Sequence, residues 1–150
     1  MKKELSIFSV GLLLYAISFV CIAVVGTGSA PFAGPNRGYM CALLGIVAPL
    51  VWGNLWSQGL GPILMPTALV SGLINPLFLA ALVLASSNRH RAFVFTRTIV
   101  VLMLPFCWIV FKYGHFQPRE GYFLWISGIL LALFSKELVK LYKSDRSMVD

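Results

Sequence analysis

The chain is 150 residues long, with 59% apolar and only 11% charged residues and a formal net charge of +7. An average soluble domain is roughly 25% charged. Together with a mean hydropathy of +0.86, this composition excludes an ordinary soluble fold and predicts an integral membrane protein. The apolar segments described below use about 110 residues, so we expect one membrane domain over residues 1–150 and no second, soluble domain.

The excess of Lys and Arg lies at the ends of apolar segments and does not gather on one soluble face. A nucleic-acid-binding protein would show a basic patch or stripe instead. We therefore expect the positive charge to contact the phosphates of the lipid bilayer, and no nucleic acid is predicted as a partner.

The first apolar segment, residues 5–26, is long enough to span a bilayer as a helix. Its basic start and the small residues Gly28 and Ala30 also resemble a signal peptide cleaved after Ala30. Its apolar region, however, is longer than the roughly 7–15 residues that such signals use. We therefore expect a retained first span, followed by a short loop at residues 26–38, where glycines and prolines prevent a helix from continuing.

The central part of the chain, from Gly38 to Asn88, contains no Asp, Glu, Lys, Arg or His. One continuous helix of that length would measure roughly 76 Å, more than twice the ~30 Å hydrocarbon core, so the segment must fold back on itself. The glycines and the proline of residues 57–62 predict the turn. We expect a second and a third span at residues 39–57 and 62–85, both kinked by internal prolines.

Two further spans complete the predicted bundle. A polar and basic sequence at residues 86–91 precedes a fourth apolar segment at 93–113. A second loop precedes a fifth segment at 121–142, which leads into a basic C-terminal tail at 143–150. The predicted fold is all-α, a polytopic transmembrane helical bundle of about five spans, with Trp and Tyr near the ends of the spans.

The orientation of this bundle is left open by two conflicting signals. Five spans place the termini on opposite faces, and the Lys and Arg residues then divide eight to four in favour of a cytoplasmic C-terminus. The leading Met-Lys-Lys favours a cytoplasmic N-terminus instead. A four-span alternative, in which residues 39–85 cross once and dip back as a re-entrant loop, places both termini inside with a cleaner charge bias.

Two polar residues inside the predicted spans are candidate contacts. Arg97 lies four residues after Phe93, and a charge at the centre of the hydrocarbon costs ~2.5–3.5 kcal/mol. At a depth of about 6 Å its side chain reaches the headgroups, so snorkelling is expected, with a bundle-interior or ligand role as the alternative. Asn75, near the middle of the third span, is expected to form an interhelical hydrogen bond or to face a solvated cavity.

Small residues recur every four positions on the third predicted span. They are Ala68, Gly72, Pro76 and Ala80. This small-x-x-x-small pattern lets two helix backbones approach closely, and Gly128 with Ala132 repeats the spacing on the fifth span. Packing within the bundle is the main interpretation, and an interface with another helix is the alternative.

Lysines also recur on one helical face at the end of the fifth predicted span. They are Lys136, Lys140 and Lys143. We expect them to contact anionic lipid headgroups, an interaction worth ~1 kcal/mol per residue near the surface. Docking of an acidic partner protein is the alternative.

Catalysis is not expected, because the residues that commonly carry it are scattered. The carboxylates Glu4, Glu120, Glu137, Asp145 and Asp150 fall in tails, loops or the last turn of a span. The two histidines lie in loops on either side of the fourth span, and the three cysteines, all within apolar segments, show no C-x-x-C spacing. No nucleophile motif occurs, so we expect neither an enzyme nor a metal site or cofactor.

The sequence therefore predicts a small non-catalytic multi-pass protein of a membrane, expected to be a bacterial inner membrane. It is expected to act by helix–helix contact with another membrane protein or itself, as a subunit of a complex or as an immunity-type factor against a pore-forming partner. The alternative is a small uncoupled transporter or channel for an apolar or anionic solute. The candidate contacts for either function are Arg97, Asn75, Ala68, Gly72 and Ala80.

Overall fold

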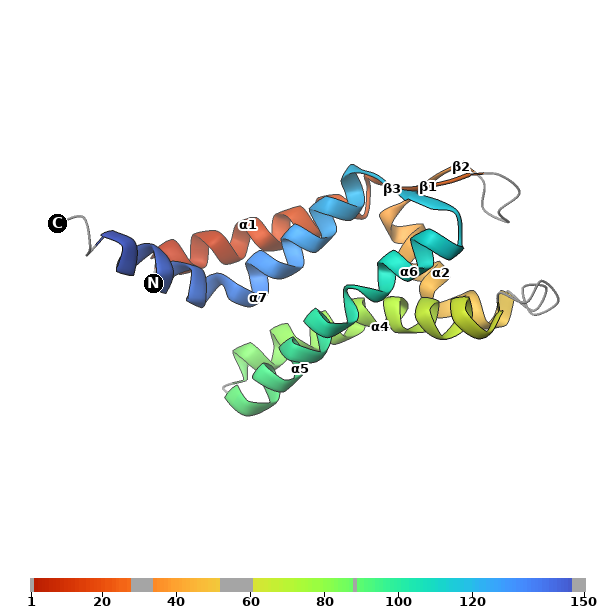
Figure 1. The fold of residues 1–150 in the computed structure, drawn as a ribbon. Coiled ribbons are helices and arrows are strands. Elements are labelled where there is room, and N and C mark those ends of the chain that lie inside the picture. Colours follow the sequence, from red (N-terminus) through yellow and green to blue (C-terminus); the bar gives the residue numbers. More distant parts are fainter. Residues whose placement is uncertain (1, 28–33, 52–60, 88, 147–150) are drawn as a thin grey trace.

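The computed structural model describes residues 2–27, 34–51, 61–87 and 89–146. It is mostly helical (79%), with a small three-stranded antiparallel sheet at one end (Figure 1). In chain order the elements are α1 (Lys2–Ser18), β1 (Ile22–Gly26), β2 (Gly34–Arg37), α2 (Gly38–Val51), α4 (Gly61–Ser86), α5 (His90–Met103), α6 (Phe106–Tyr113), β3 (Phe116–Pro118) and α7 (Glu120–Arg146).

Three helices of the described chain are long and apolar enough to cross a membrane. They are Pro66–Ser86, His90–Tyr113 and Glu120–Val139, and Glu4–Ser18 is a shorter apolar helix. The three long helices correspond to the third, fourth and fifth predicted spans. The chain is therefore a multi-pass membrane protein by the length and composition of its helices.

The first predicted span was wrong at its C-terminal end. The helix ends at Ser18, and the residues from Ile22 to Gly26 form strand β1 instead of continuing it. The sequence from Val20 to Val25 is rich in β-branched residues, which favour a strand. The backbone groups of this segment form hydrogen bonds with the neighbouring strands β2 and β3 and not within a helix.

The outer strands β2 and β3 of the sheet come from the two segments that were predicted to be plain loops, and the central strand β1 comes from the end of the first predicted span. The strand order is β2-β1-β3, and both pairs are antiparallel. The amide of Arg119 donates to the carbonyl of Ala23 at 2.8 Å, and the amide of Thr27 donates to that of His115 at 2.9 Å. Each edge strand contains a proline, Pro35 or Pro118, which limits further pairing at that edge.

Helices α1 and α7 lie side by side and run antiparallel (Figure 1). Gly11 lies against Ala132 near the middle of the pair, and Gly121 lies against Ile22 at the sheet end. At the other end Lys136 Nζ lies 3.9 Å from Glu4 Oε1. The start of α1 and the end of α7 therefore share one end of the molecule, whereas five alternating spans would have made these two helices parallel.

Helix α2 begins at the sheet end, where the amide of Tyr39 donates to the carbonyl of Phe19 at 3.1 Å. It packs against α4, and Figure 1 shows it beside the first part of α4, on the same side of the molecule as the sheet. The second predicted span is therefore helical over Gly38–Val51. Most of the turn predicted at residues 57–62 lies outside the described residues.

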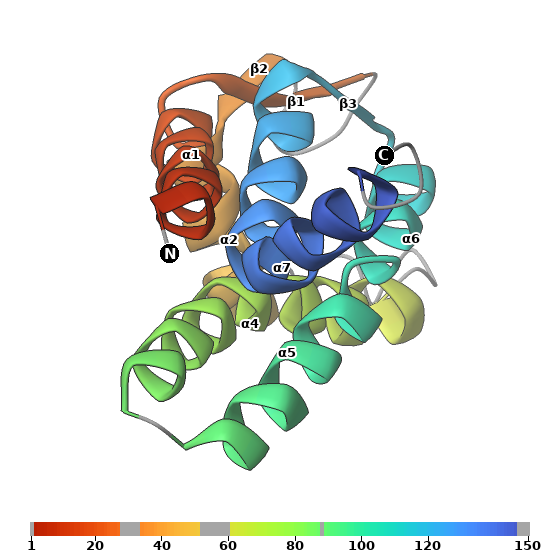
Figure 2. The same cartoon turned by 90° about the vertical axis from the view of Figure 1, so that its left-hand side faces the viewer.

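Helices α5 and α6 together form the fourth predicted span and meet at Pro105. Proline has no amide hydrogen, so it cannot donate to the preceding turn. The amides of Cys107 and Trp108 instead bond three residues back, to the carbonyls of Leu104 and Pro105. Helix α5 packs against the second half of the long helix α4, and Figure 2 shows this pair beneath the α1–α7 pair.

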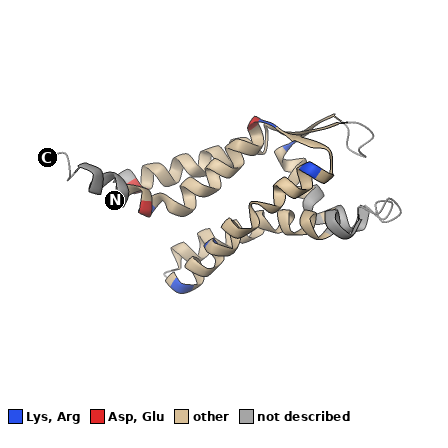
Figure 3. Cartoon of the chain, viewed as in Figure 1, with Lys and Arg blue, Asp and Glu red and all other residues tan. Residues whose placement is uncertain are grey.

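The core contains apolar side chains from α4, α5, α6 and α7. The largest fully buried ones are Phe78, Ile74, Ile129 and Val100. Large apolar residues on the outside, such as Phe95 at 68% and Leu102 at 66% exposure, suit a lipid-facing surface. Charged residues gather at the ends of the helices and near the sheet, and the helix centres are almost free of them (Figure 3).

Candidate functional site

A cavity of about 130 Å³ lies where the sheet meets α2, α4, α6 and α7. Each of these elements contributes to its wall: Val24 comes from β1, Cys41 from α2, Ser71 from α4, Cys107 from α6 and Trp125 from α7. The wall is mostly apolar. A well-formed apolar pocket with a few convergent polar groups is the usual form of a small-molecule site.

Glycines bring the elements around this cavity close together. A Cβ added to Gly38 at the start of α2 would collide with the carbonyl of Ser18, and one added to Gly121 would lie 2.8 Å from the carbonyl of Ile22. On α4, the buried small residues Ala68 and Gly72 form part of the wall. The space exists because α4 presents no bulky side chain at these two positions.

The polar centre of the cavity wall is Asn75. Its Oδ1 accepts a hydrogen bond from Tyr15 Oη on α1 at 3.1 Å and another from Trp125 Nε1 on α7 at 2.8 Å. One amide on α4 thus joins three helices. The sequence predicted an interhelical hydrogen bond or a solvated cavity for Asn75, and the structure shows the interhelical hydrogen bonds and places Asn75 in the wall of this mostly apolar cavity.

An aromatic cluster surrounds Tyr122 on the α7 side of the cavity. The ring of Tyr122 lies 4.7 Å from that of Phe111, 5.9 Å from Trp125 and 6.0 Å from Trp108, measured between centroids. Tyr122 is 4% exposed, and its hydroxyl has no hydrogen-bond partner within the described structure. The contacts with Phe111 and Trp108 are edge-to-face, and contacts of this kind add to the stability given by burial.

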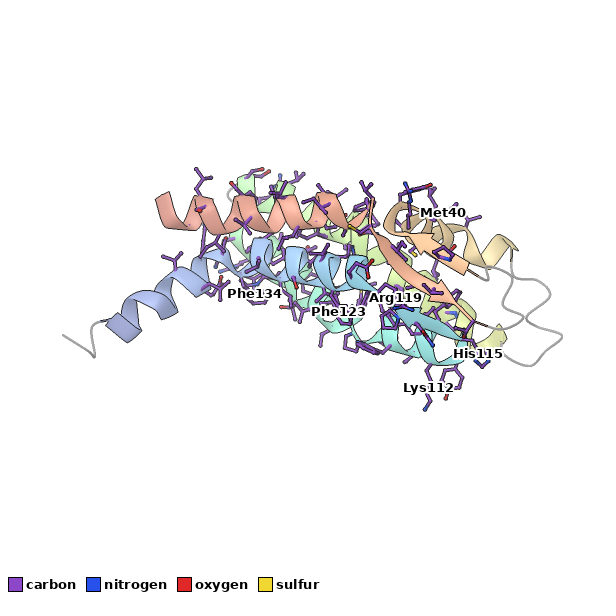
Figure 4. The ribbon with its side chains drawn as sticks, turned by 90° about the horizontal axis from the view of Figure 1, so that it is seen from above. Met40, Lys112, His115, Arg119, Phe123 and Phe134 are labelled. Atoms are coloured by element: carbon purple, nitrogen blue, oxygen red, sulfur yellow. The ribbon has the colours of Figure 1, made fainter. Side chains whose placement is uncertain are left out.

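Arg97 lies away from the cavity, between α5 and α7. It forms an ion pair with Glu137, and its guanidinium lies 4.7 Å from the ring of Phe134 and 5.4 Å from that of Phe93. Its side chain is 16% exposed, against 44% for Glu137. Figure 4 shows Phe134 well apart from Lys112, His115 and Arg119, which lie near the sheet.

The small-residue stripe of α4 does not form one continuous face. Ala68 and Gly72 are buried, whereas Pro76 and Ala80 are exposed. Four residues advance the helix by about 400°, so a stripe with that spacing turns by about 40° at each step. Its first half faces the cavity and its second half faces outward.

The small residues of α7 pack inside the molecule. A Cβ added to Gly128 would lie 2.6 Å from the amide nitrogen of Tyr15, and one added to Gly11 would lie 2.6 Å from that of Ala132. These residues therefore allow α1 and α7 to pack closely.

The predicted lipid-contacting lysines lie on the last turns of α7. Lys136 is exposed and near Glu4, as described above. Lys140 and Lys143 belong to the helix, but their side chains lie outside the described part of the structure. Their contact with lipid stays a prediction.

The polar side-chain groups in the described wall of the cavity are hydroxyls, thiols, amides and the indole of Trp125. None of its described lining residues is Asp, Glu, Lys, Arg or His. Over the part of the chain that the structure describes, no group of three or more His, Cys, Asp or Glu residues is arranged to hold a metal ion. Cys21, Cys41 and Cys107 are free thiols, and the last two line the cavity.

Sequence reasoning did not identify the partners of the two polar candidates. Tyr15 and Trp125 were read as parts of spans, although a mid-span amide requires partners and both side chains carry a donor. Glu137 was read as an end-of-span carboxylate, although a half-buried Arg requires a counter-ion. In both cases the pairing depends on helix order, which the sequence did not settle.

Comparisons of this chain with protein-family models, curated proteins and solved structures gave no match.

Proposed function

We propose that the chain crosses the membrane four times, through α1, α4, the α5–α6 pair and α7. The antiparallel contact of α1 with α7 supports an even number of crossings. Helix α1 has 17 residues, of which the apolar part is Glu4–Ser18, shorter than the three long helices and than the roughly 17–25 apolar residues that usually span a bilayer. Helix α2 then stays on the side of the sheet, which corresponds to the re-entrant alternative for residues 39–85.

The distribution of charge supports the same topology. The end that holds both termini and the α4–α5 connection carries Lys2, Lys3, Arg89, Arg91, Arg97, Lys136, Lys140, Lys143 and Arg146. The end that holds the sheet carries only Arg37, Lys112 and Arg119. By the positive-inside rule both termini face the cytoplasm, as for a protein of a bacterial inner membrane.

We further propose that the protein binds a small, mostly apolar solute within the membrane and performs no catalysis. The observation that carries this proposal is the mostly apolar cavity with Asn75 in its wall. Of the two solute classes expected from the sequence, the apolar one is favoured. Arg97, the expected anion contact, is paired with Glu137 and is not among the residues that line the cavity.

Native mass spectrometry of the protein purified in mild detergent tests this function. Ala68 is 3% exposed and lines the cavity, so Ala68→Leu fills the space, whereas Ala85→Leu makes the same change on the exposed side of α4. We expect a bound small molecule on the wild type and on Ala85→Leu, and its loss from Ala68→Leu. Equal occupancy in all three proteins, or no bound molecule on any, contradicts the proposal.

Helix–helix contact with a membrane partner is the second candidate function. The exposed half of the small-residue stripe, Pro76 and Ala80, supports it because a neighbouring helix packs closely against such residues. Here Ala80→Leu abolishes co-purification of the partner protein, and Ala68→Leu leaves it unchanged. The two candidates thus predict opposite sensitivities for two alanines of the same helix.

A further inference from the structure

The orientation of the Asn75 amide is fixed by its neighbours. The indole N–H of Trp125 is only a donor, so the group that faces it at 2.8 Å must be the amide oxygen. The hydroxyl of Tyr15 donates to the same oxygen at 3.1 Å. The Nδ2 group, which carries two N–H donors, therefore points away from both Tyr15 and Trp125.

This Nδ2 group is one available donor in the cavity wall, and Tyr122, whose hydroxyl has no hydrogen-bond partner within the described structure, also lines the cavity. The Nδ2 group has no hydrogen-bond partner among the residues that the structure describes, and Asn75 lines the cavity. The hydroxyl of Ser71, one turn earlier on α4, donates to the carbonyl of Thr67 at 2.8 Å, and that of Ser18 donates to the carbonyl of Tyr15 at 2.6 Å. These two serines can offer lone pairs to a ligand, but their protons are already used.

The size and electrostatics of the cavity restrict its occupant further. Its volume of about 130 Å³ is close to the ~150 Å³ of an apolar cavity that accepts one benzene ring. Phe111, Tyr122 and Trp125 line it with aromatic surface. No charged side chain faces the space from its described walls, so an ionised ligand would lack a counter-ion there.

We infer that the cavity binds a neutral, ring-sized group that carries one oxygen acceptor, and that Asn75 Nδ2 donates to this oxygen. A phenolic hydroxyl fits best, since it accepts from Asn75 and donates its own proton to a serine oxygen such as that of Ser71. This inference rests on the proposed solute-binding function and names the chemical class of the solute. A free small phenol and the ring of a long-tailed phenolic lipid present the same chemistry.

The test uses the full chain in mild detergent and two probes followed by ¹⁹F NMR, 4-fluorophenol and fluorobenzene. Empty micelles provide the baseline for partition into detergent. We expect saturable binding of 4-fluorophenol to the wild type and to Ala85→Leu, with fluorobenzene at least tenfold weaker. Asn75→Leu should reduce the affinity for 4-fluorophenol to that for fluorobenzene, and Ala68→Leu should abolish the binding of both probes.

The affinities of the two probes for the wild type test the hydrogen bond to Asn75 even if Asn75→Leu does not fold. Equal affinity for both probes overturns the hydrogen-bonded class and leaves the solute-binding function standing. No saturable binding of either ring to the folded wild type overturns both proposals. Displacement of bound 4-fluorophenol by 4-nonylphenol identifies a long-tailed lipid as the source, and the lack of displacement identifies a free phenol.

Discussion

The guanidinium of Arg97 on α5 forms an ion pair with the carboxylate of Glu137 on α7, forty residues later in the chain. The same guanidinium lies over the ring of Phe134, and its Nη1 is 3.5 Å from the carbonyl oxygen of Leu133. Arg97 therefore connects the α4–α5 pair to the α1–α7 pair near the end of the molecule that holds both termini.

Removing one member of this ion pair should destabilise the protein. Glu137→Leu leaves the guanidinium of Arg97, whose side chain is 16% exposed, without its carboxylate, which we expect to cost about 1–3 kcal/mol. The double variant Arg97→Leu/Glu137→Leu should recover most of that loss, because no unpaired charge is left. The unfolding free energies of the wild type, the two single variants and the double variant are measured in mixed micelles. Strictly additive losses of stability would show that the two residues are not coupled.

The hydrogen bonds of Asn75 should contribute measurably to stability. Asn75→Leu removes the acceptor of both Tyr15 and Trp125, and interhelical hydrogen bonds in membranes are worth about 0.6–2 kcal/mol each. Tyr15→Phe removes only one of them and should cost less. Detergent unfolding followed by Trp fluorescence measures both variants. A loss for Tyr15→Phe as large as that for Asn75→Leu would contradict this ranking.

The close packing of α1 on α7 should depend on Gly11. Its added Cβ would lie 2.6 Å from a backbone nitrogen, an atom that cannot move without the helix. We expect Gly11→Val to destabilise the protein by about 1–3 kcal/mol or more. Ala16→Val, on the exposed side of the same helix, is the control and should have little effect. Equal thermal stability of the two variants would mean that α1 does not pack there.

The thiol of Cys107 should react more slowly than that of Cys21. Cys107 is 6% exposed in the cavity wall, whereas Cys21, between α1 and β1, is partly exposed. In single-cysteine variants, alkylation by the membrane-permeant reagent N-ethylmaleimide, followed by mass spectrometry, should therefore be faster at Cys21. Equal rates would place Cys107 on an open surface.

The sequence predicted a mostly helical fold and the three long helices because apolar segments of that length leave few alternatives, but the all-α prediction missed the three-stranded sheet. It did not predict the end of α1 at Ser18, since a short apolar segment such as the one after Phe19 suits a helix as well as a strand until its pairing partners are known. Strand β3, more than eighty residues later, supplies one of those partners.

The site was only partly predictable for a similar reason. Asn75 and Arg97 stand out in sequence because a polar group in an apolar span requires a partner. The identity of each partner depends on which helices are neighbours. The cavity itself depends on how the sheet, α2, α4, α6 and α7 meet. No local sequence pattern predicts the space that Ala68 and Gly72 leave open on α4.

Membrane topology is the property to measure first, because four crossings place α2, the sheet and the cavity toward one face. In a cysteine-free background, Lys3→Cys, Ser87→Cys and Gln117→Cys are labelled in turn with an impermeant maleimide from each side of oriented vesicles. With four crossings, positions 3 and 87 are labelled from the same face and position 117 from the opposite face. Labelling of positions 3 and 87 from opposite faces would contradict this topology.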